Sequence, residues 1–362
     1  MPRSSRRASA RRLRCRPTRA GGHISEPNYR FSHSKHHFTD ARNPMDARNQ
    51  MTVDETNFFA AGEARHAVRL RPDWAELVEA FQELGPVEVR TENRSVSHIK
   101  RGEFDNVSFE GPIGLVLAGD IDLRLFTHHW KWARAVRSEA KDAIEIYDGY
   151  GRCVFEVRCV GRCDAQAFVS LVDAFAAEEF ESVEPDELPD EPPMQVEDVD
   201  DETAASFAQA WRDMEDTHEF FGMLREHGLE RHVALELAPD GFAVEAEDGA
   251  LHRVFELAEA SQTPIMVFVS SGGCVQIHTG TVRVEHLDEA GMRVEGPNFE
   301  LWVDRTQLAD AWVVEKPTVD GIVTSLEVFD RRSEMAFQVF GERKPGKPEL
   351  EAWRKIVAQL AP

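Results

Sequence analysis

His218 is the residue of this chain whose type and position are best suited to chemistry. Residues 207–229 predict an amphipathic helix, because apolar side chains recur there at spacings of three, four and seven. His218 falls on this apolar stripe, four residues after Met214 and three before Phe221. The stripe consists of Phe207, Trp211, Met214, Phe221 and Leu224.

Two interpretations of His218 are open at this point. It is either a core histidine that is hydrogen-bonded to the backbone, or an axial ligand to iron with the apolar stripe as one wall of a flat pocket. An axial histidine uses one ring nitrogen for iron, so we expect the other to donate to a backbone carbonyl or to water. Glu215, Asp216 and Glu219 then either raise the basicity of the ring or form the solvated side of the helix.

Five blocks of sequence, taken together, are more specific than the stripe alone. Their order and spacing, from about residue 45 to the C-terminus, resemble the HemS/ChuS/PhuS-type family of cytoplasmic haemin-transport and haemin-degrading proteins. The resemblance implies that haem b (iron protoporphyrin IX) is the cofactor, with His218 as its iron ligand. The blocks are residues 211–229, 111–126, 265–280, 311–321 and 324–343.

The resemblance also implies roles for residues away from His218. Arg124 alternates with Ile121, Leu123 and Leu125, so periodicity alone allows a surface cation on a strand. In the family the matching arginine approaches the iron face opposite the histidine, where its donors can hold an iron-bound water or oxygen.

The remaining implied site residues form the rim and walls of the pocket. Phe340 stands where relatives often carry tyrosine, so a hydroxyl partner is missing. His98 matches a histidine implicated in haem binding in some relatives, and is a second candidate ligand. Cations expected at the propionates or the rim are Arg231, Lys316 and Arg343, and the expected wall residue is Phe268.

Composition limits the classes of partner. The 362 residues carry a formal charge of −23, which argues against nucleic acid or an anionic membrane as a partner of the whole surface. No apolar run reaches the length of a membrane helix, so we expect no membrane insertion. The five cysteines form no CxxC pair; Cys159 and Cys163 resemble half of a zinc site, but reduced thiols in a cytoplasmic protein are expected.

The globular part is internally duplicated. Residues 144–157 align without a gap on residues 326–339, both with the alternation of a β-hairpin, and residues 86–102 align on 264–280. An apolar helical pattern follows each hairpin. We therefore predict an α+β fold of two homologous halves, each an antiparallel β-sheet with flanking helices.

This duplication divides the chain into four segments. Residues 1–44 form an arginine-rich tail, interpreted as disordered or as an overlong gene start, although its composition also resembles a transit peptide. Residues 45–177 and 204–362 form the two repeats. Residues 178–203 are acidic and proline-rich, which indicates an extended linker or, alternatively, a docking segment for a basic partner. The His218 segment occurs only in the second half, so one site shared by both halves is expected.

Three functions fit these residues. The first is a cytoplasmic haem carrier in haem-iron uptake, which would meet transporter components and a haem-accepting protein such as a haem oxygenase. The second is an enzyme that opens the porphyrin ring with oxygen and releases iron; because the chain has no GxGxxG fingerprint, a partner reductase would supply electrons. The third is a haem-free apolar-ligand or interaction module, which the substitution at Phe340 would favour.

Overall fold

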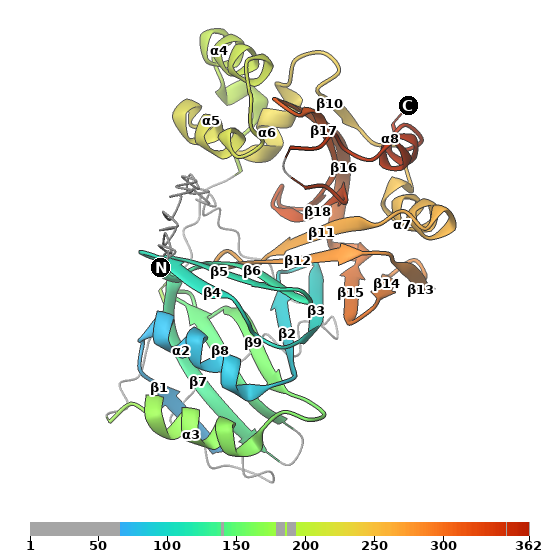
Figure 1. Cartoon of the computed structure of the whole chain (residues 1–362). Coiled ribbons are helices and arrows are strands. Elements are labelled where there is room, and N and C mark those ends of the chain that lie inside the picture. Colours follow the sequence, from blue (N-terminus) through green and yellow to red (C-terminus); the bar gives the residue numbers. More distant parts are fainter. Residues whose placement is uncertain (1–65, 139–140, 179–184, 187–192, 345, 362) are drawn as a thin grey trace, which may run out of the picture.

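The computed structural model describes residues 66–138, 141–178, 185–186, 193–344 and 346–361. The basic tail predicted at residues 1–44 lies outside these ranges. Within them, the strands form two nine-stranded antiparallel sheets, which we call sheet A and sheet B (Figure 1).

The strands of each sheet are given in spatial order. Sheet A contains β1 (His66–Leu70), β7 (Trp130–Ser138), β8 (Lys141–Asp148), β9 (Cys153–Cys159), β2 (Val87–Glu92), β3 (Val96–Gly102), β15 (Phe299–Asp304), β14 (Gly291–Gly296) and β13 (Arg283–Leu287). Sheet B contains β10 (Ala243–Glu245), β16 (Leu308–Thr318), β17 (Gly321–Asp330), β18 (Met335–Gly341), β11 (Ile265–Ser270), β12 (Cys274–Gly280), β6 (Ile121–Phe126), β5 (Ile113–Ala118) and β4 (Val107–Glu110).

Each sheet is completed by three strands from the other half of the chain. β15 of the second half pairs with β3, with Phe299 opposite Lys100, and β6 of the first half pairs with β12, with Asp122 opposite Ile277. The fold class is α+β with two homologous halves, as predicted. The exchange of strands between the halves was not predicted.

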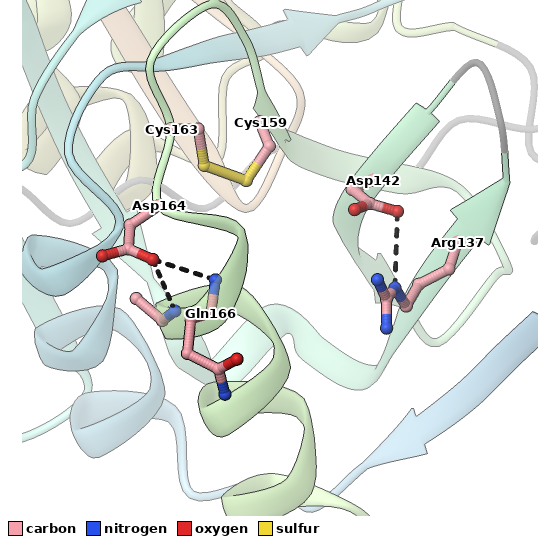
Figure 2. Close-up of a disulfide and its surroundings, with 7 residues drawn as sticks. Arg137, Asp142, Cys159, Cys163, Asp164 and Gln166 are labelled. Atoms are coloured by element: carbon pink, nitrogen blue, oxygen red, sulfur yellow. Dashed lines mark hydrogen bonds and ion pairs between the residues drawn. A yellow bond between two sulfur atoms is a disulfide. The ribbon is translucent and has the colours of Figure 1, made fainter.

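The duplicated segments form the expected hairpins. Ile144 pairs with Val157 in β8–β9, and Leu326 pairs with Val339 in β17–β18. Each hairpin is followed by a helix, α3 (Ala165–Phe175) or α8 (Glu351–Val357). The first of these begins at Asp164, whose carboxylate accepts hydrogen bonds from the N–H groups of Gln166 and Ala167 (Figure 2).

Two helices of each half cover one face of its paired strands. In the first half α2 (Trp74–Ala80) and α3 pack on sheet A, together with the inner side of β5–β6. In the second half α7 (Ala250–Ser261) and α8 pack on sheet B, together with β14–β15. Alternation sets this arrangement: Ile265, Val267 and Val269 of β11 are buried in the core, whereas Met266 and Phe268 point to the opposite face. Short 3-10 helices connect these elements at Phe81–Leu84, Thr127–His129 and Arg305–Gln307.

The expectation of reduced thiols is wrong for one pair of cysteines. Cys159 and Cys163 form a disulfide across the turn between β9 and α3, with their Cα atoms 5.2 Å apart (Figure 2). The turn is closed by a hydrogen bond from the N–H of Cys163 to the carbonyl of Val160, which brings the two side chains together. The redox compartment alone does not predict a disulfide that depends on this local turn geometry.

Part of the acidic segment is folded. A 3-10 helix covers Val196–Asp198, and α4 (Asp201–Arg212) begins within the segment that we predicted as an extended linker. Its N-cap is Asp200, which accepts a hydrogen bond from the N–H of Thr203. Among the described residues, no helix is both long enough and apolar enough to span a bilayer.

Candidate functional site

The candidate site lies on the face of sheet B opposite α7 and α8, which we call the outer face. Strand register places four of the predicted residues on this face, because directly opposed residues share a side and alternate residues repeat it. Phe268 opposes Ile277, and Ile277 opposes Asp122, which is two residues from Arg124. Met266 opposes Phe340, and the phenyl rings of Phe268 and Phe340 lie 5.2 Å apart.

The same register places Lys316 on the outer face. Lys316 is two residues from Val314, which opposes Ser325, and Ser325 opposes Phe340. The outer face therefore extends from Lys316 on β16, across the aromatic pair, to Arg124 on β6. Because β6 comes from the first half, both halves contribute to one surface.

The middle of the outer face is apolar. Phe126, Val275 and Ile277 form its buried part, and Ile113, Met266 and Phe268 pack against them while staying half-buried. A shallow depression adjoins this floor, between Phe268, Ser270 and Gln338. A broad, partly exposed apolar floor with few polar groups is suited to a flat hydrophobic ligand.

Three helices of the second half stand at one end of the outer face, beside β10, β16 and β17 (Figure 1). They are α4, α5 (Glu219–His227) and α6 (Arg231–Glu236). Phe207, Trp211 and Phe220 are fully buried between these helices and Val314 and Phe329 of the sheet. The indole N–H of Trp211 donates to the carbonyl of Glu315 at 3.1 Å, which fixes the helical group to β16.

The single helix predicted over residues 207–229 is wrong. The chain leaves the helix after Arg212 and starts a new one at Glu219. The physical cause is a local alternative to the helical hydrogen bonds: the carboxylate of Asp216 accepts from the N–H of His218, and the carbonyl of Asp216 accepts from Glu219. The break rotates the second segment, so Phe220 is fully buried in place of Phe221.

His218 consequently lies at the start of α5 rather than in the middle of a helix. Its side chain is 62% exposed, and its Nδ1 lies 2.6 Å from Oδ1 of Asp216. The expected partner was a backbone carbonyl or water, and the structure shows a carboxylate instead. Partial burial opposes ionisation of Asp216, but hydrogen bonds from the backbone and the ring of His218 lower the pKa of this carboxyl group.

The His218 loop is fixed to the end of sheet B. The carbonyl of Glu215 accepts a hydrogen bond from the N–H of Val319, in the turn between β16 and β17. Arg343 lies at the same place, with its Nη2 4.0 Å from Oδ2 of Asp320, and its charge helps to lower the pKa of Asp216. Arg343 thus lies near the His218 loop.

Arg231 and Lys316 meet a carboxylate that we did not predict. Glu327 is fully buried, and it accepts hydrogen bonds from Nε and Nη2 of Arg231, both at 2.7 Å, and from Nζ of Lys316 at 2.6 Å. The ring of Phe220 lies 4.9 Å from the guanidinium carbon and 4.7 Å from Nζ, so it stacks on both cations. The two cations and one carboxylate leave a formal charge of +1 beside the outer face.

Burial and charge have opposite effects within this cluster. Burial disfavours the carboxylate of Glu327, but the charges of Arg231 and Lys316 lower its pKa far below the usual range. Burial lowers the pKa of Lys316 to about 8, although Glu327 opposes that shift. One signal in the sequence could have revealed Glu327: it aligns with Glu145 of the first half, whose carboxylate accepts from Nε of Arg134 at 2.7 Å.

Arg124 is engaged by a neighbour on its own strand. Its guanidinium donates to Asp122 and to the carbonyl of Leu123, and its side chain is 27% exposed. Burial raises the pKa of Asp122 despite the charge of Arg124. Arg124 therefore stands at the β6 end of the apolar floor, with its charge partly balanced.

His98 is not brought to the outer face. It lies on β3 of sheet A, fully buried and edge-on to Phe299, with 5.0 Å between ring centroids. Burial, followed by the charges of His278 and Lys100, holds the pKa of His98 well below its ordinary value. His278 stacks on the same Phe299 at 3.8 Å, so both histidines belong to the joint between the sheets.

The metal ligands that the described residues offer suit iron that is already bound by a porphyrin. Within the described residues, no group of three or more His, Cys, Asp or Glu side chains is placed to hold a free metal ion. An exposed imidazole on a loop fixed to the end of sheet B, together with an apolar floor and cations on the same sheet, provides groups that haem needs, because the porphyrin nitrogens supply four of the iron ligands.

The sequence matches the haemin-degrading HemS/ChuX domain twice, at residues 52–175 and 228–360. The chain belongs to this family. It is 30% identical over 320 residues to the hemin transport protein HmuS of Yersinia pestis, covering 87% of this chain and 92% of HmuS. The hemin transport protein HemS of Yersinia enterocolitica is 31% identical over 322 residues, covering 87% and 92%.

Solved structures of relatives agree with this fold. The heme-binding protein PhuS of Pseudomonas aeruginosa, in its holo form, is 39% identical with a TM-score of 0.76, covering 81% of this chain and 86% of PhuS. ChuS of Escherichia coli, described as a heme oxygenase, is 32% identical with a TM-score of 0.73, covering 82% of this chain and 89% of ChuS. As in the sequence alignment, nearly the whole folded part of the chain is included.

Proposed function

We propose that this protein binds one haem b on the outer face of sheet B, carries it in the cytoplasm after import and passes it to an acceptor. The observation that carries the proposal is that one sheet presents an apolar floor together with Arg124 of the other half, while the loop that bears an exposed histidine is fixed to the turn at one end of the same sheet. Relatives described as hemin transport and heme-binding proteins support it.

The chain's own residues have distinct tasks in this proposal. His218 provides the axial nitrogen, and Phe268 with Phe340 forms the wall on which the ring lies. Arg343 and the net positive charge around Lys316 and Arg231 attract the propionates, which offsets the negative charge of the whole chain. Bound haem supplies iron for ligation and, in a degrading enzyme, for oxygen chemistry.

Exposure of His218 favours the carrier role. A single protein ligand at the end of a helix, 62% exposed, leaves the iron accessible to a competing base on an acceptor protein. We propose a haem-uptake transporter as the source and a haem oxygenase as one possible class of acceptor.

A haem-degrading enzyme is the second candidate. Arg124 lies on the outer face, where its N–H groups would donate hydrogen bonds to the reacting ligand of a bound haem, and ChuS is described as a heme oxygenase. This reaction needs dioxygen and electrons from a partner reductase. The chain would then position the haem and donate hydrogen bonds, and would not itself supply electrons.

One experiment separates these functions. Purified protein is titrated with haemin, followed by ascorbate under oxygen, and the Soret band and free iron are measured. A Soret shift with an intact ring is the expected result for the carrier. Loss of the ring with iron release would establish the enzyme, and no Soret shift would mean a haem-free module.

A further inference from the structure

We propose that Asp216 is the positioning residue of the haem ligand: its carboxylate holds Nδ1–H of His218 and presents Nε2 to the iron. This inference rests on the proposed function, and it adds a residue to which we had given only a general electrostatic role. The same hydrogen bond determines which ring nitrogen is free to bind iron.

The geometry assigns the tautomer. Oδ1 of Asp216 lies 2.6 Å from Nδ1 of His218 and 2.9 Å from the backbone N–H of the same residue. An ionised carboxylate can only accept hydrogen bonds, so Nδ1 must carry the proton. The lone pair of the neutral ring is then on Nε2, which points away from Asp216 by the shape of imidazole.

The pair is held by contacts on both sides of the loop. The carbonyl of Asp216 accepts from the N–H of Glu219 at 3.1 Å, and Glu215 is bonded through its carbonyl to Val319 at 2.9 Å. The loop is thus fixed to the β16–β17 turn before any ligand arrives, and the ring orientation is prepared.

The other two acidic neighbours do not perform this task. The carboxylate of Glu219 accepts from the backbone N–H of Glu215 at 3.4 Å, so it faces back along the loop. The described contacts of Glu215 are made by its backbone. Asp216 alone contacts the ring among the three, which provides matched variants for a test.

A carboxylate that is hydrogen-bonded to Nδ1 affects the electronic properties of the iron as well as the orientation of the ring. It makes the imidazole a stronger donor, which stabilises ferric over ferrous iron and strengthens the bond to Nε2. When haem covers the loop and excludes water, the hydrogen bond should become stronger. We therefore expect Asp216 to favour retention of ferric haem during transfer.

The test compares Asp216→Asn with Glu215→Gln, which removes the same charge one residue away. In the haem-free protein, nitrogen NMR should show His218 protonated at Nδ1 in wild type and in Glu215→Gln. In Asp216→Asn the population should shift towards the Nε2–H tautomer. This first readout does not depend on haem.

The second readout is the loaded protein. We expect Asp216→Asn to lower the iron–histidine stretching frequency, to raise the reduction potential and to weaken haemin binding several-fold, whereas Glu215→Gln changes none of these. Asp216→Glu, which keeps a carboxylate, should recover part of the stretching frequency. If Asp216→Asn and Glu215→Gln behave alike in both readouts, the inference about Asp216 is wrong. Loss of the histidine-ligated spectrum in His218→Ala would then still show that His218 binds the iron. If His218→Ala retains the histidine-ligated spectrum, His218 is not the iron ligand. The tautomer measured without haem would then be a property of the loop alone.

Discussion

Among single residues, Glu327 was not predicted from the sequence. Its buried carboxylate provides the counter-charge for Arg231 and Lys316. Glu327→Gln would leave Arg231 and Lys316 as two buried cations without a counter-charge. Breaking a buried ion pair in this way costs about 3–5 kcal/mol, and we expect that loss in the free energy of unfolding from urea denaturation.

The first half provides the matched control for Glu327. Glu145→Gln removes the equivalent carboxylate, which accepts hydrogen bonds from Nε of Arg134 and from the hydroxyl of Tyr147, both at 2.7 Å. We expect a clearly smaller loss of stability there. Equal losses in the two variants would contradict the view that the helix carrying Arg231 makes the second cluster more dependent on its carboxylate.

His278 gives the protein a predictable sensitivity to acid. Burial lowers its pKa from 6.5 to about 3, so the unfolded chain binds more protons than the folded one between these values. This contribution to stability is complete above pH 6.5 and is lost as the pH falls towards 3, with a slope of up to about 1.4 kcal/mol per pH unit.

Urea denaturation at a series of pH values tests this prediction. His278→Gln cannot titrate, so its stability should fall less steeply than that of wild type between pH 6 and 4. The exposed His286, on β13, serves as a control through His286→Gln. Parallel curves for wild type and His278→Gln would show that other groups cause the acid sensitivity.

At the level of secondary-structure elements, the pairing of β6 with β12 brings residues of both halves onto one surface. Arg124→Ala should therefore change the sixth coordination position, seen as a change of spin state or of the acid–alkaline transition of bound water. A hydrogen bond from a charged donor contributes about 1.5–3 kcal/mol, so haem affinity should fall modestly while His218 still holds the iron. An unchanged spectrum would place Arg124 outside the site.

The type and faces of many elements were predictable because the hydrophobic pattern that indicates them lies within the element itself. Alternation in Ile265–Ser270 and in the two duplicated hairpins was enough to identify the strands and their faces. The helix of residues 207–229 failed because its apolar period continues across Asp213–His218, where a single side chain, Asp216, offers the backbone an alternative hydrogen bond.

Long-range pairing was not predictable from one sequence. Nothing in the residues of β6 specifies β12, about 150 positions later, as its neighbour, because many apolar strands are compatible with that edge. The contact of Arg231 and Lys316 with Glu327 was not predictable for the same reason, although Arg231 and Lys316 themselves were named as candidate site residues. His98 was also placed by resemblance only, and the structure locates it in the joint between the sheets.

At the scale of the whole molecule, the exchange of strands predicts that neither half is independent. Residues 204–362 alone would lose β4, β5 and β6, which exposes the edge of β12 and removes Phe126 from the apolar floor. We expect this fragment to self-associate and to bind haem more weakly, with a more exposed iron. Size-exclusion chromatography and haemin titration check this, and adding residues 45–177 should restore binding. A monomeric fragment with full affinity would contradict a shared site.

We propose that His218 binds the iron of one haem per chain. The most direct measurement is a haemin titration of wild type, His218→Ala and His227→Ala, followed by resonance Raman spectroscopy of the ferrous complexes. His227 lies on the same helix, where its Nδ1 contacts the carbonyl of Met223, so it controls for the loss of a nearby histidine. We predict an iron–histidine band and one equivalent of haem for wild type and His227→Ala, with the band lost and affinity reduced in His218→Ala. The same band and the same affinity in His218→Ala would show that another base binds the iron.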